Sequence, residues 1–279
     1  MNVGILHPGE MGISVAATIQ NSGHTVYWVS EGRSAQSRAR AEKHGLLDAS
    51  SLAHLVEICP VVVSVCPPDA AEDLAHDVLT HPFTGLYLDA NAISPQRAQH
   101  IGQAVHDRGA TFVDGGIIGG PAWMPSTTWL YLSGSAADEA ASLFSAGPLE
   151  TRIVGDAIGK ASALKMCFAA YTKGTTALLS AILATAEVLG VRAELEQQWG
   201  AEFADEATRK VRQVTAKAWR FVGEMEEIAA TFAEAGLPDG FHSAAGEIYS
   251  RMDGFKDAPA VPALDEVLAA LREVYRTRP

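Results

Sequence analysis

The chain has 279 residues, 48% of them hydrophobic, and a formal net charge of −12 at pH 7. This length and apolar content exclude an intrinsically disordered chain and predict a packed protein of one or two domains. The acidic charge disfavours nucleic acid and anionic membranes as partners, because both repel a negative protein surface.

Two further patterns bear on compartment and metal binding. Cys59, Cys66 and Cys167 lie in apolar contexts without CxxC or Cys/His spacing, which predicts reduced core thiols and no metal site. No basic segment precedes the first strand, and the longest strongly apolar run, residues 60–68, is too short to span a bilayer. We therefore expect a cytoplasmic protein without a membrane segment.

The amino-terminal half alternates short apolar runs with helix-like segments. Runs rich in β-branched or aromatic residues predict strands at 2–6, 25–29, 61–65, 86–90 and 111–115. Segments such as 10–21 and 95–108 carry apolar residues at helical spacing. This alternation predicts a parallel sheet covered on both faces. Two further apolar runs, at 128–134 and 151–154, complete the predicted sheet.

The first predicted strand leads into the turn His7-Pro8-Gly9-Glu10-Met11-Gly12. A dinucleotide-binding turn reads G-x-G-x-x-G, where the second glycine lets the pyrophosphate approach and the third lets the helix pack on the strand. Here His7 replaces the first glycine, which is tolerated if its φ is ordinary. We predict that residues 7–11 bind a dinucleotide at the helix N-terminus; a turn without ligand is the alternative.

The second predicted strand ends at Ser30, where an NAD enzyme places a carboxylate for the ribose hydroxyl. Ser30 is neutral, and Arg33 and Ser34 follow it. A guanidinium pairs with phosphate through two parallel hydrogen bonds, so Ser30, Arg33 and Ser34 favour NADP with its 2′-phosphate. Glu31 leaves NAD open, and Arg33 on a solvated loop is the other interpretation.

No strand-like run follows Gly159. Residues 160–190 are Ala/Leu-rich and apolar on most faces, which predicts a long buried helix covered by a second subunit. A packing seam at steps of three and four follows, made of Val211, Val214, Ala218, Phe221, Met225, Ile228 and Phe232. The predicted fold class is α/β: a Rossmann-like, doubly wound, mostly parallel sheet (1–157) followed by an all-α domain (158–279).

Four motifs together resemble the β-hydroxyacid dehydrogenase family, which includes the 6-phosphogluconate and 3-hydroxyisobutyrate dehydrogenases. They are GILHPGEMG (4–12), LDANAISP (88–95), VDGGIIGGP (113–121) and GKASALKMCFAA (159–170). The chain looks most like a subgroup whose helical C-terminal domain has no assigned function. The resemblance covers essentially the full length, and it implies hydride transfer between NAD(P) and a small acid by dimers formed through the helical domains.

The resemblance implies cofactor and substrate contacts on the sheet. The loop after the strand at 61–65, with Cys66 and Pro67, corresponds to the stretch that covers the cofactor's ribose and pyrophosphate. The family's Ser-Thr pair falls on Asn91 and Ala92, of which Asn91 can hydrogen-bond a carboxamide or a substrate oxygen. Gly119 and Gly120 keep backbone N–H groups for a substrate carboxylate.

The family's catalytic lysine falls on Lys165. A free lysine has a pKa of about 10.4, and burial beside a positive nicotinamide ring disfavours the ammonium form, which suits a general acid/base. Snorkelling of Lys165 to water is the alternative. Tyr171 and His242 are further candidates for substrate contact, as is Lys173, although a lone histidine is more often structural.

Two departures from the family pattern concern the substrate. Ile118 replaces the family's serine and Ala169 its asparagine, which makes the pocket more apolar. We predict an NADP-dependent oxidoreductase acting on a small hydroxyacid or carbonyl compound. The alternatives are an imine reductase, whose family members usually lack a lysine at position 165, and a non-catalytic dinucleotide-binding protein.

Overall fold

The computed structural model describes residues 1–256 and 258–272 and divides into two compact units. The amino-terminal unit is Met1–Met166, and the helical unit begins at Cys167. The division falls inside helix α7 (Lys160–Val188), so the first two turns of this helix belong with the sheet.

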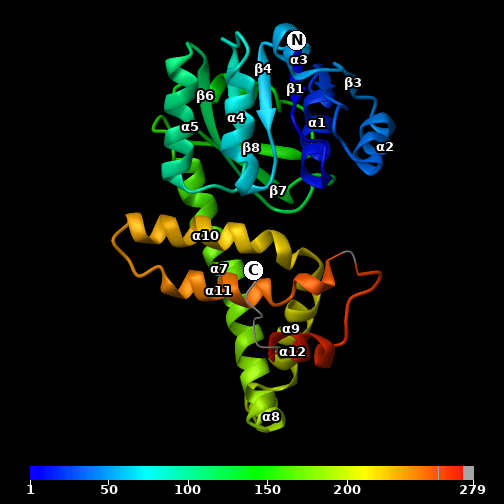
Figure 1. Cartoon of the computed structure of the whole chain (residues 1–279), viewed down its shortest axis with the longest axis vertical. Helices are drawn as coiled ribbons and strands as arrows, with labels where there is room; N and C mark the ends of the chain where they lie inside the picture. Colours follow the sequence, from blue (N-terminus) through cyan, green and yellow to red (C-terminus); the bar gives the residue numbers. More distant parts are fainter. Residues whose placement is uncertain (257, 273–279) are drawn as a thin grey trace. The chain divides into compact units, whose positions relative to one another are not determined.

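The amino-terminal unit is built on an eight-stranded sheet with the order β3-β2-β1-β4-β5-β6-β7-β8 (Figure 1). The strands are β1 (Asn2–Ile5), β2 (Thr25–Trp28), β3 (Leu47–Asp48), β4 (Val61–Ser64), β5 (Leu86–Asp89), β6 (Thr111–Ile118), β7 (Thr128–Ser133) and β8 (Leu149–Gly155). Strands β1 to β6 are parallel, β7 is antiparallel to β6, and β8 is parallel to β7. Strands are added outward on one side of β1 up to β3 and on the other side from β4 onward, and open α/β sheets bind ligands at such a switch point between β1 and β4.

Helices cover both faces of this sheet, as predicted. They are α1 (Glu10–Asn21), α2 (Ala35–Lys43), α3 (Leu52–Ile58), the 3₁₀ turn η1 (Pro68–Ala70), α4 (Ala71–Leu79), α5 (Pro95–Asp107) and α6 (Ala137–Ser142). One buried cluster joins α1 and α6 to the sheet, and a second joins α3, α4 and α5. Val61 and Val63 of β4 belong to the first cluster and Val62 to the second, because successive strand side chains point to opposite faces.

All seven predicted strands are present, and the mostly parallel, doubly wound sheet is confirmed. The prediction missed β3, whose two residues are too few to show a periodicity. It also ended the strand at 111–115 too early, since β6 continues through Gly116 to Ile118.

The helical unit contains no strand among its described residues. Its helices after α7 are α8 (Arg192–Trp199), α9 (Ala201–Val214), the 3₁₀ turn η2 (Thr215–Lys217), α10 (Ala218–Glu234), α11 (Gly240–Ser250), η3 (Asp253–Phe255) and α12 (Leu264–Arg272). The predicted seam is divided between α9 and α10 by η2. Val211, Ala218, Met225 and Ile228 of this seam are buried.

Helix α7 keeps an apolar face exposed in the single chain. Leu164, Phe168, Tyr171, Leu178 and Val188 follow helical spacing and are 37% to 71% exposed. By length and composition α7 also passes as a membrane-spanning helix. One such helix is weak support for a membrane span, because long core helices of soluble proteins have the same composition.

Candidate functional site

The turn between β1 and α1 has the backbone that a dinucleotide site requires. A Cβ at Gly12 would lie 2.0 Å from the His7 carbonyl oxygen, so only glycine lets α1 pack this closely on the strand. A Cβ at Gly9 would meet no atom within 4 Å, which leaves open space beside the turn. No side chain caps α1 at Gly9. Its first N–H groups are therefore placed to bind an anion.

His7 fills the position of the missing first glycine without backbone strain. Ser50 and Ser126 are the non-glycine residues with positive φ in the described part of the chain, so His7 has the ordinary φ that the sequence required. Its Nε2 contacts the Arg33 guanidinium. Burial, and secondarily the charge of Arg33, lower the pKa of His7 to about 4. The ring is therefore neutral at pH 7, and Nε2 accepts the hydrogen bond.

Unsatisfied donors remain at this turn. With Nε2 accepting from Arg33, the proton of the neutral His7 ring is on Nδ1. His7 Nδ1 and Arg33 Nε are buried and have no hydrogen-bond partner among the described residues. Buried polar atoms rarely stay unpaired, so two orphan donors beside an open glycine turn fit an anionic ligand.

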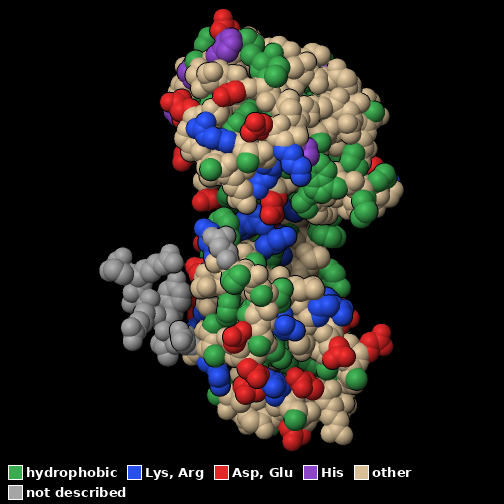
Figure 2. All heavy atoms as spheres, turned by 90° about the vertical axis from the view of Figure 1, so that its right-hand side faces the viewer, with side chains coloured by type: hydrophobic (Ala, Val, Ile, Leu, Met, Phe, Trp, Pro, Cys, Tyr) green, Lys and Arg blue, Asp and Glu red, His purple; other side chains and the backbone are tan. Residues whose placement is uncertain are grey.

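The region after β2 is basic, and its backbone is firmly held. Arg33 donates a further hydrogen bond to the Leu6 carbonyl oxygen at 3.2 Å, and Arg40 of α2 donates to that of Pro8 at 3.1 Å. Ser34 caps α2 by accepting from Ser37 N at 3.2 Å. Asp48 of β3, which the sequence did not single out, accepts from Ser30 N. Figure 2 shows Lys and Arg side chains on the face of the unit that carries α2.

Asn91 lies at the carboxyl end of β5 and is 2% exposed. Its Nδ2 donates to Ser64 Oγ and to Asp89 Oδ2, both at 3.0 Å, and its Oδ1 accepts from Cys66 N at 2.6 Å. Both amide protons are therefore in use within the protein. In the structure the Asn91 side chain positions the Cys66–Pro67 loop, and its predicted contact with cofactor or substrate stays a prediction.

Asp89 anchors this network from below. It is 1% exposed and also accepts from Asn91 N at 2.9 Å. Burial raises its pKa to about 7, with the hydrogen bonds from Asn91 opposing and the neighbouring Asp114 assisting the rise. Protonation near neutral pH therefore changes the charge of the group that holds Asn91, and Asn91 in turn holds the loop at Cys66.

The end of β6 supplies the predicted glycine pair. Gly119 has φ +128°, and a Cβ there would lie 2.5 Å from the Thr127 carbonyl oxygen, so glycine is required. Gly120 is exposed, and its carbonyl oxygen accepts from Thr128 Oγ1 at 2.7 Å. Their exposed backbone lies at the same strand ends as Asn91 and the glycine turn.

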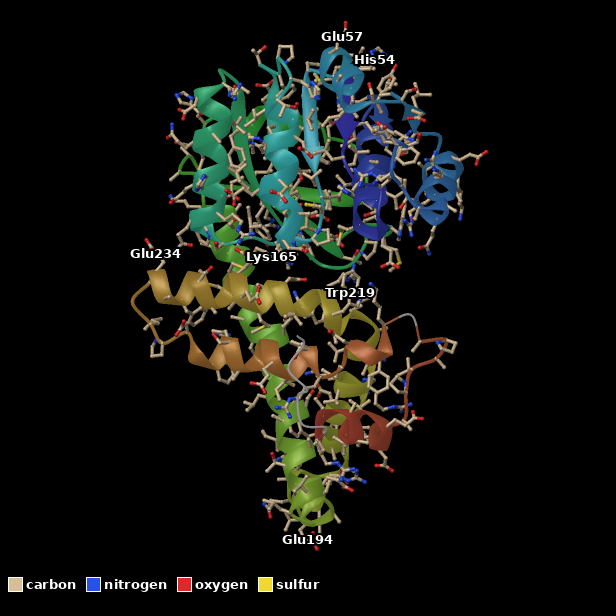
Figure 3. The ribbon with its side chains drawn as sticks, viewed as in Figure 1. His54, Glu57, Lys165, Glu194, Trp219 and Glu234 are labelled. Carbon is tan, nitrogen blue, oxygen red and sulfur yellow. The ribbon has the colours of Figure 1, made fainter. Side chains whose placement is uncertain are left out.

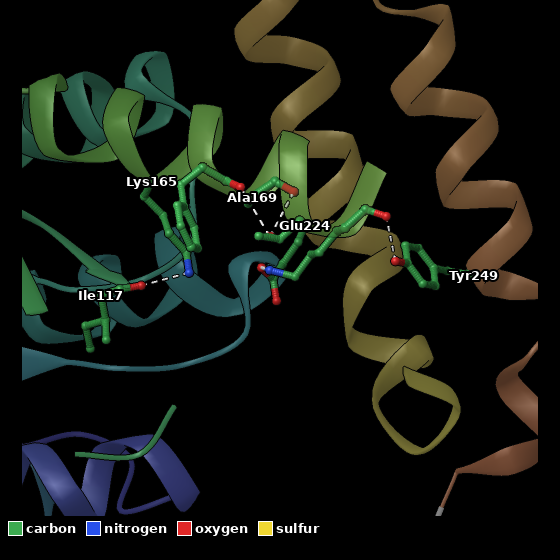
Figure 4. A network of polar contacts seen from close by, with 8 residues as sticks. Ile117, Lys165, Ala169, Glu224 and Tyr249 are labelled. Carbon is green, nitrogen blue, oxygen red and sulfur yellow. Dashed lines mark hydrogen bonds and ion pairs between the residues drawn. The ribbon is translucent and has the colours of Figure 1, made fainter. Parts of the chain in front are cut away.

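Lys165 reaches the same edge of the sheet from the second turn of α7 (Figure 3). Its Nζ donates to the Ile117 carbonyl oxygen at 2.8 Å (Figure 4). The side chain is half-buried. The amine is thus held against the end of β6, one residue before Ile118 and the glycine pair.

The remaining predicted residues lie in the helical unit. Tyr171 is 71% exposed. His242 is 4% exposed and packs on Phe232 and Phe241, with ring centroids 4.2 and 5.1 Å away, and burial lowers its pKa. This packing favours the structural alternative for His242.

Lys173 is also committed within the helical unit. It pairs with Glu224, and its carbonyl oxygen accepts from the Tyr249 hydroxyl at 2.8 Å (Figure 4). This pair ties α7 to α10 and leaves Lys173 a structural cation.

The three cysteines are distributed over both units of the chain. No three His, Cys, Asp or Glu side chains gather as a metal site within residues 1–256 and 258–272. Cys59 is buried and Cys66 half-buried. Cys167 is exposed, so the prediction of a core thiol is wrong there, because it lies on the outer side of α7.

The sheet order and glycine turn define a dinucleotide-binding domain of the oxidoreductase type. The family described as the NAD binding domain of 6-phosphogluconate dehydrogenase matches residues 2–145, and a domain of unknown function, DUF1932, matches residues 186–252. The chain belongs to the β-hydroxyacid dehydrogenase family, with a helical C-terminal region.

Curated relatives are distant. An uncharacterized protein of Methanothermus fervidus is 29% identical over 210 residues, which cover 74% of this chain and 80% of that protein. The mitochondrial 3-hydroxyisobutyrate dehydrogenase of Drosophila melanogaster is 22% identical over 141 residues, which cover 50% of this chain and 43% of that enzyme.

Solved structures share the fold over nearly the whole chain. The conserved protein MTH1747, of unknown function and similar to 3-hydroxyacid dehydrogenases, is 28% identical with a TM-score of 0.66, covering 91% of this chain and 97% of its own. The Mycobacterium tuberculosis 3-hydroxyisobutyrate dehydrogenase is 18% identical with a TM-score of 0.71, covering 98% and 99%. A reductive aminase of Aspergillus terreus, solved with NADPH and ethyl-5-oxohexanoate, is 17% identical with a TM-score of 0.56, covering 97% and 99%.

Proposed function

We propose that this protein is an NADP-dependent oxidoreductase that acts on a small hydroxyacid or carbonyl compound, with Lys165 as general acid/base. One observation carries the proposal. Lys165 Nζ is held at the Ile117 carbonyl oxygen, at the sheet edge that also carries the open glycine turn.

The residues of this edge fit the cofactor. The N–H groups of the first turn of α1 suit the pyrophosphate, and Gly9 leaves room for it. The loop at Cys66 and Pro67, fixed by Asn91, borders the same edge. When bound, NADP supplies hydride acceptance or donation at its nicotinamide ring.

Charge favours NADP over NAD. Residues 30–44 contain four Lys or Arg against two Glu, in a chain whose net charge is −12. Arg33 is held beside the turn by His7 and the Leu6 carbonyl oxygen, and its buried Nε has no partner among the described residues, which leaves one donor for a phosphate oxygen. Glu31, the residue that would bind the ribose of NAD, is exposed to solvent.

Lys165 supplies the proton step. A carbonyl oxygen only accepts, so Ile117 orients the amine without taking its proton. An alcohol substrate gives its hydroxyl proton to the neutral amine as it is oxidised, and a carbonyl substrate takes a proton from the ammonium as it is reduced. Positioned acid–base catalysis of this kind contributes roughly 10²–10⁴ in rate.

A second candidate is an imine reductase on the same scaffold. Ile118 and Ala169, which stand where the resembling dehydrogenases carry serine and asparagine, favour a less polar substrate.

The free thiols of the cysteines support a reducing, cytoplasmic setting for this enzyme, and the exposed face of α7 supports a homodimer formed through the helical unit.

Cofactor binding and substrate class can be tested together. We expect NADPH absorbance to fall with small keto acids or aldehydes, whereas turnover restricted to cyclic imines would support the second candidate.

Arg33→Ala should weaken NADPH binding by about 10- to 100-fold and NADH binding by less than about 3-fold, because it removes charge-assisted bonds to the 2′-phosphate. Arg108→Ala, an exposed arginine at the end of α5, is the matched control. Equal losses for both cofactors would contradict the NADP assignment.

A further inference from the structure

Asp114 of β6 is a buried carboxylate that the proposed reaction does not use. It is 1% exposed. Its Oδ2 accepts from the N–H groups of Gly159, Ala161 and Ser162 at 2.9, 3.0 and 3.1 Å, and its Oδ1 accepts from Ser162 Oγ at 2.6 Å. The carboxylate therefore binds the first turn of α7, where its negative charge suits the helix dipole.

A third element joins this network. Ser133 of β7 donates from Oγ to Asp114 Oδ2 at 2.8 Å, and the same Oγ accepts from Ala161 N at 3.1 Å. Burying a carboxylate is unfavourable unless hydrogen bonds compensate it, and five donors do so here. The network fixes α7 to two neighbouring strands.

Two later residues of β6 continue the contact with α7. A Cβ at Gly116 would lie 2.7 Å from the Ala161 carbonyl oxygen and 3.0 Å from Lys165 Cβ, so the helix lies directly on the strand there. Ile117 then accepts from Lys165 Nζ. Lys165 follows Ser162 by three residues, about one helical turn, so the rotation that Asp114 imposes on the first turn also sets the direction of the lysine.

We propose that Asp114 is a positioning residue for Lys165. Its carboxylate fixes how the first turn of α7 is rotated about the helix axis and how far along β6 it lies. This keeps the lysine amine at the Ile117 carbonyl oxygen. The inference rests on the proposed function for its catalytic meaning, but the placement of the amine is measurable without any substrate.

Asp114→Asn is the informative variant, because it keeps the shape of the side chain and removes the charge and one acceptor. The chain has seven lysines, so lysine labelled with ¹³C at Cε gives a simple spectrum, in which Lys165→Arg identifies one signal. We expect the Lys165 signal of Asp114→Asn to move toward those of exposed lysines such as Lys217. Amide exchange at Ala161 and Ser162 should rise about tenfold or more, because charge-assisted bonds are lost.

Two further variants control for a general loss of packing. Asp89→Asn removes the buried carboxylate paired in register with Asp114, whose hydrogen bonds go to Asn91 rather than α7, and should leave the Lys165 signal in place. Ser162→Ala removes only one hydroxyl donor to Asp114, so it disturbs the fold less than Asp114→Asn does. It should move the Lys165 signal in the same direction but by a smaller amount than Asp114→Asn.

Three results would overturn the proposal: an unchanged Lys165 signal while the first-turn amides exchange faster, no change in either, or an equal shift in Asp89→Asn. Once a substrate is known, Asp114→Asn should lower kcat with little change in KM and displace the pH profile. If Lys165→Met leaves turnover intact, the proposed function fails while the placement of the amine by Asp114 still stands.

Discussion

At the scale of single residues, His7 shows how a side chain can replace a glycine in a dinucleotide turn. Its φ is ordinary, so the turn keeps its shape. Its neutral ring holds Arg33, which lies 26 residues away in the chain. The sequence predicted a phosphate role for Arg33, but not this contact, because only the pairing of β1 with β2 brings the two residues together.

Asp89 and Asp114 illustrate what the sequence could not show. The motifs drew attention to Asn91 and to the glycines at 119 and 120, since these matched a family pattern. The two carboxylates are brought together only when the end of β5 pairs in register with the middle of β6, which the spacing of the sequence does not reveal. An aspartate inside or directly at the end of an apolar strand was the signal in the sequence, although it does not say which backbone groups the carboxylate binds.

Asp89 also predicts a pH dependence of stability. Its folded pKa of about 7 exceeds the unfolded value of about 3.9, so the folded state binds a proton that the unfolded state lacks between these values. Protonated Asp89 therefore contributes fully to the free energy of unfolding below about pH 4. This contribution, up to about 4 kcal/mol, is lost as pH rises to about 7.

Asp89→Asn removes this titration. Thermal unfolding should show the variant improving relative to wild type between about pH 4 and about pH 7, since only the wild type carries this titration. A constant difference in Tm across the range would show that Asp89 does not titrate as the structure indicates.

At the scale of elements, the strongly periodic segments were predicted well and the short ones were not. Strands with continuous apolar runs were found because both faces of the sheet are buried. The break at η2 was missed because the apolar seam continues across it from α9 to α10, so spacing alone gives no sign of the interruption.

The turn between β1 and α1 gives a paired prediction. Gly9→Ala should leave Tm within a few degrees of wild type and weaken NADPH binding about tenfold or more, because its Cβ enters open space where the pyrophosphate must approach. Gly12→Ala should destabilise the fold by about 2 kcal/mol or more, because its Cβ would collide with the His7 carbonyl oxygen. Circular dichroism and a fluorescence titration separate the two effects. Equal behaviour of both variants would contradict this division of roles.

At the scale of the whole molecule, the exposed face of α7 predicts association. Leu178 on this face is 45% exposed, and Leu47 in β3 is 46% exposed. If a second copy covers α7, Leu178→Glu should convert a dimer to a monomer in light scattering, because it places a charge in an apolar interface. Leu47→Glu should remain dimeric. A wild-type protein that is monomeric at all concentrations would exclude the dimer.

In the proposed reaction, the amine held at the end of β6 transfers the proton. Comparing Lys165→Met with Lys160→Met, an exposed lysine on the same helix, tests this most directly in steady-state turnover of NADPH. We expect kcat to fall by roughly 10²–10⁴ for Lys165→Met and to stay near normal for Lys160→Met. A loss of less than about tenfold at Lys165, with NADPH still bound, would contradict this proton transfer.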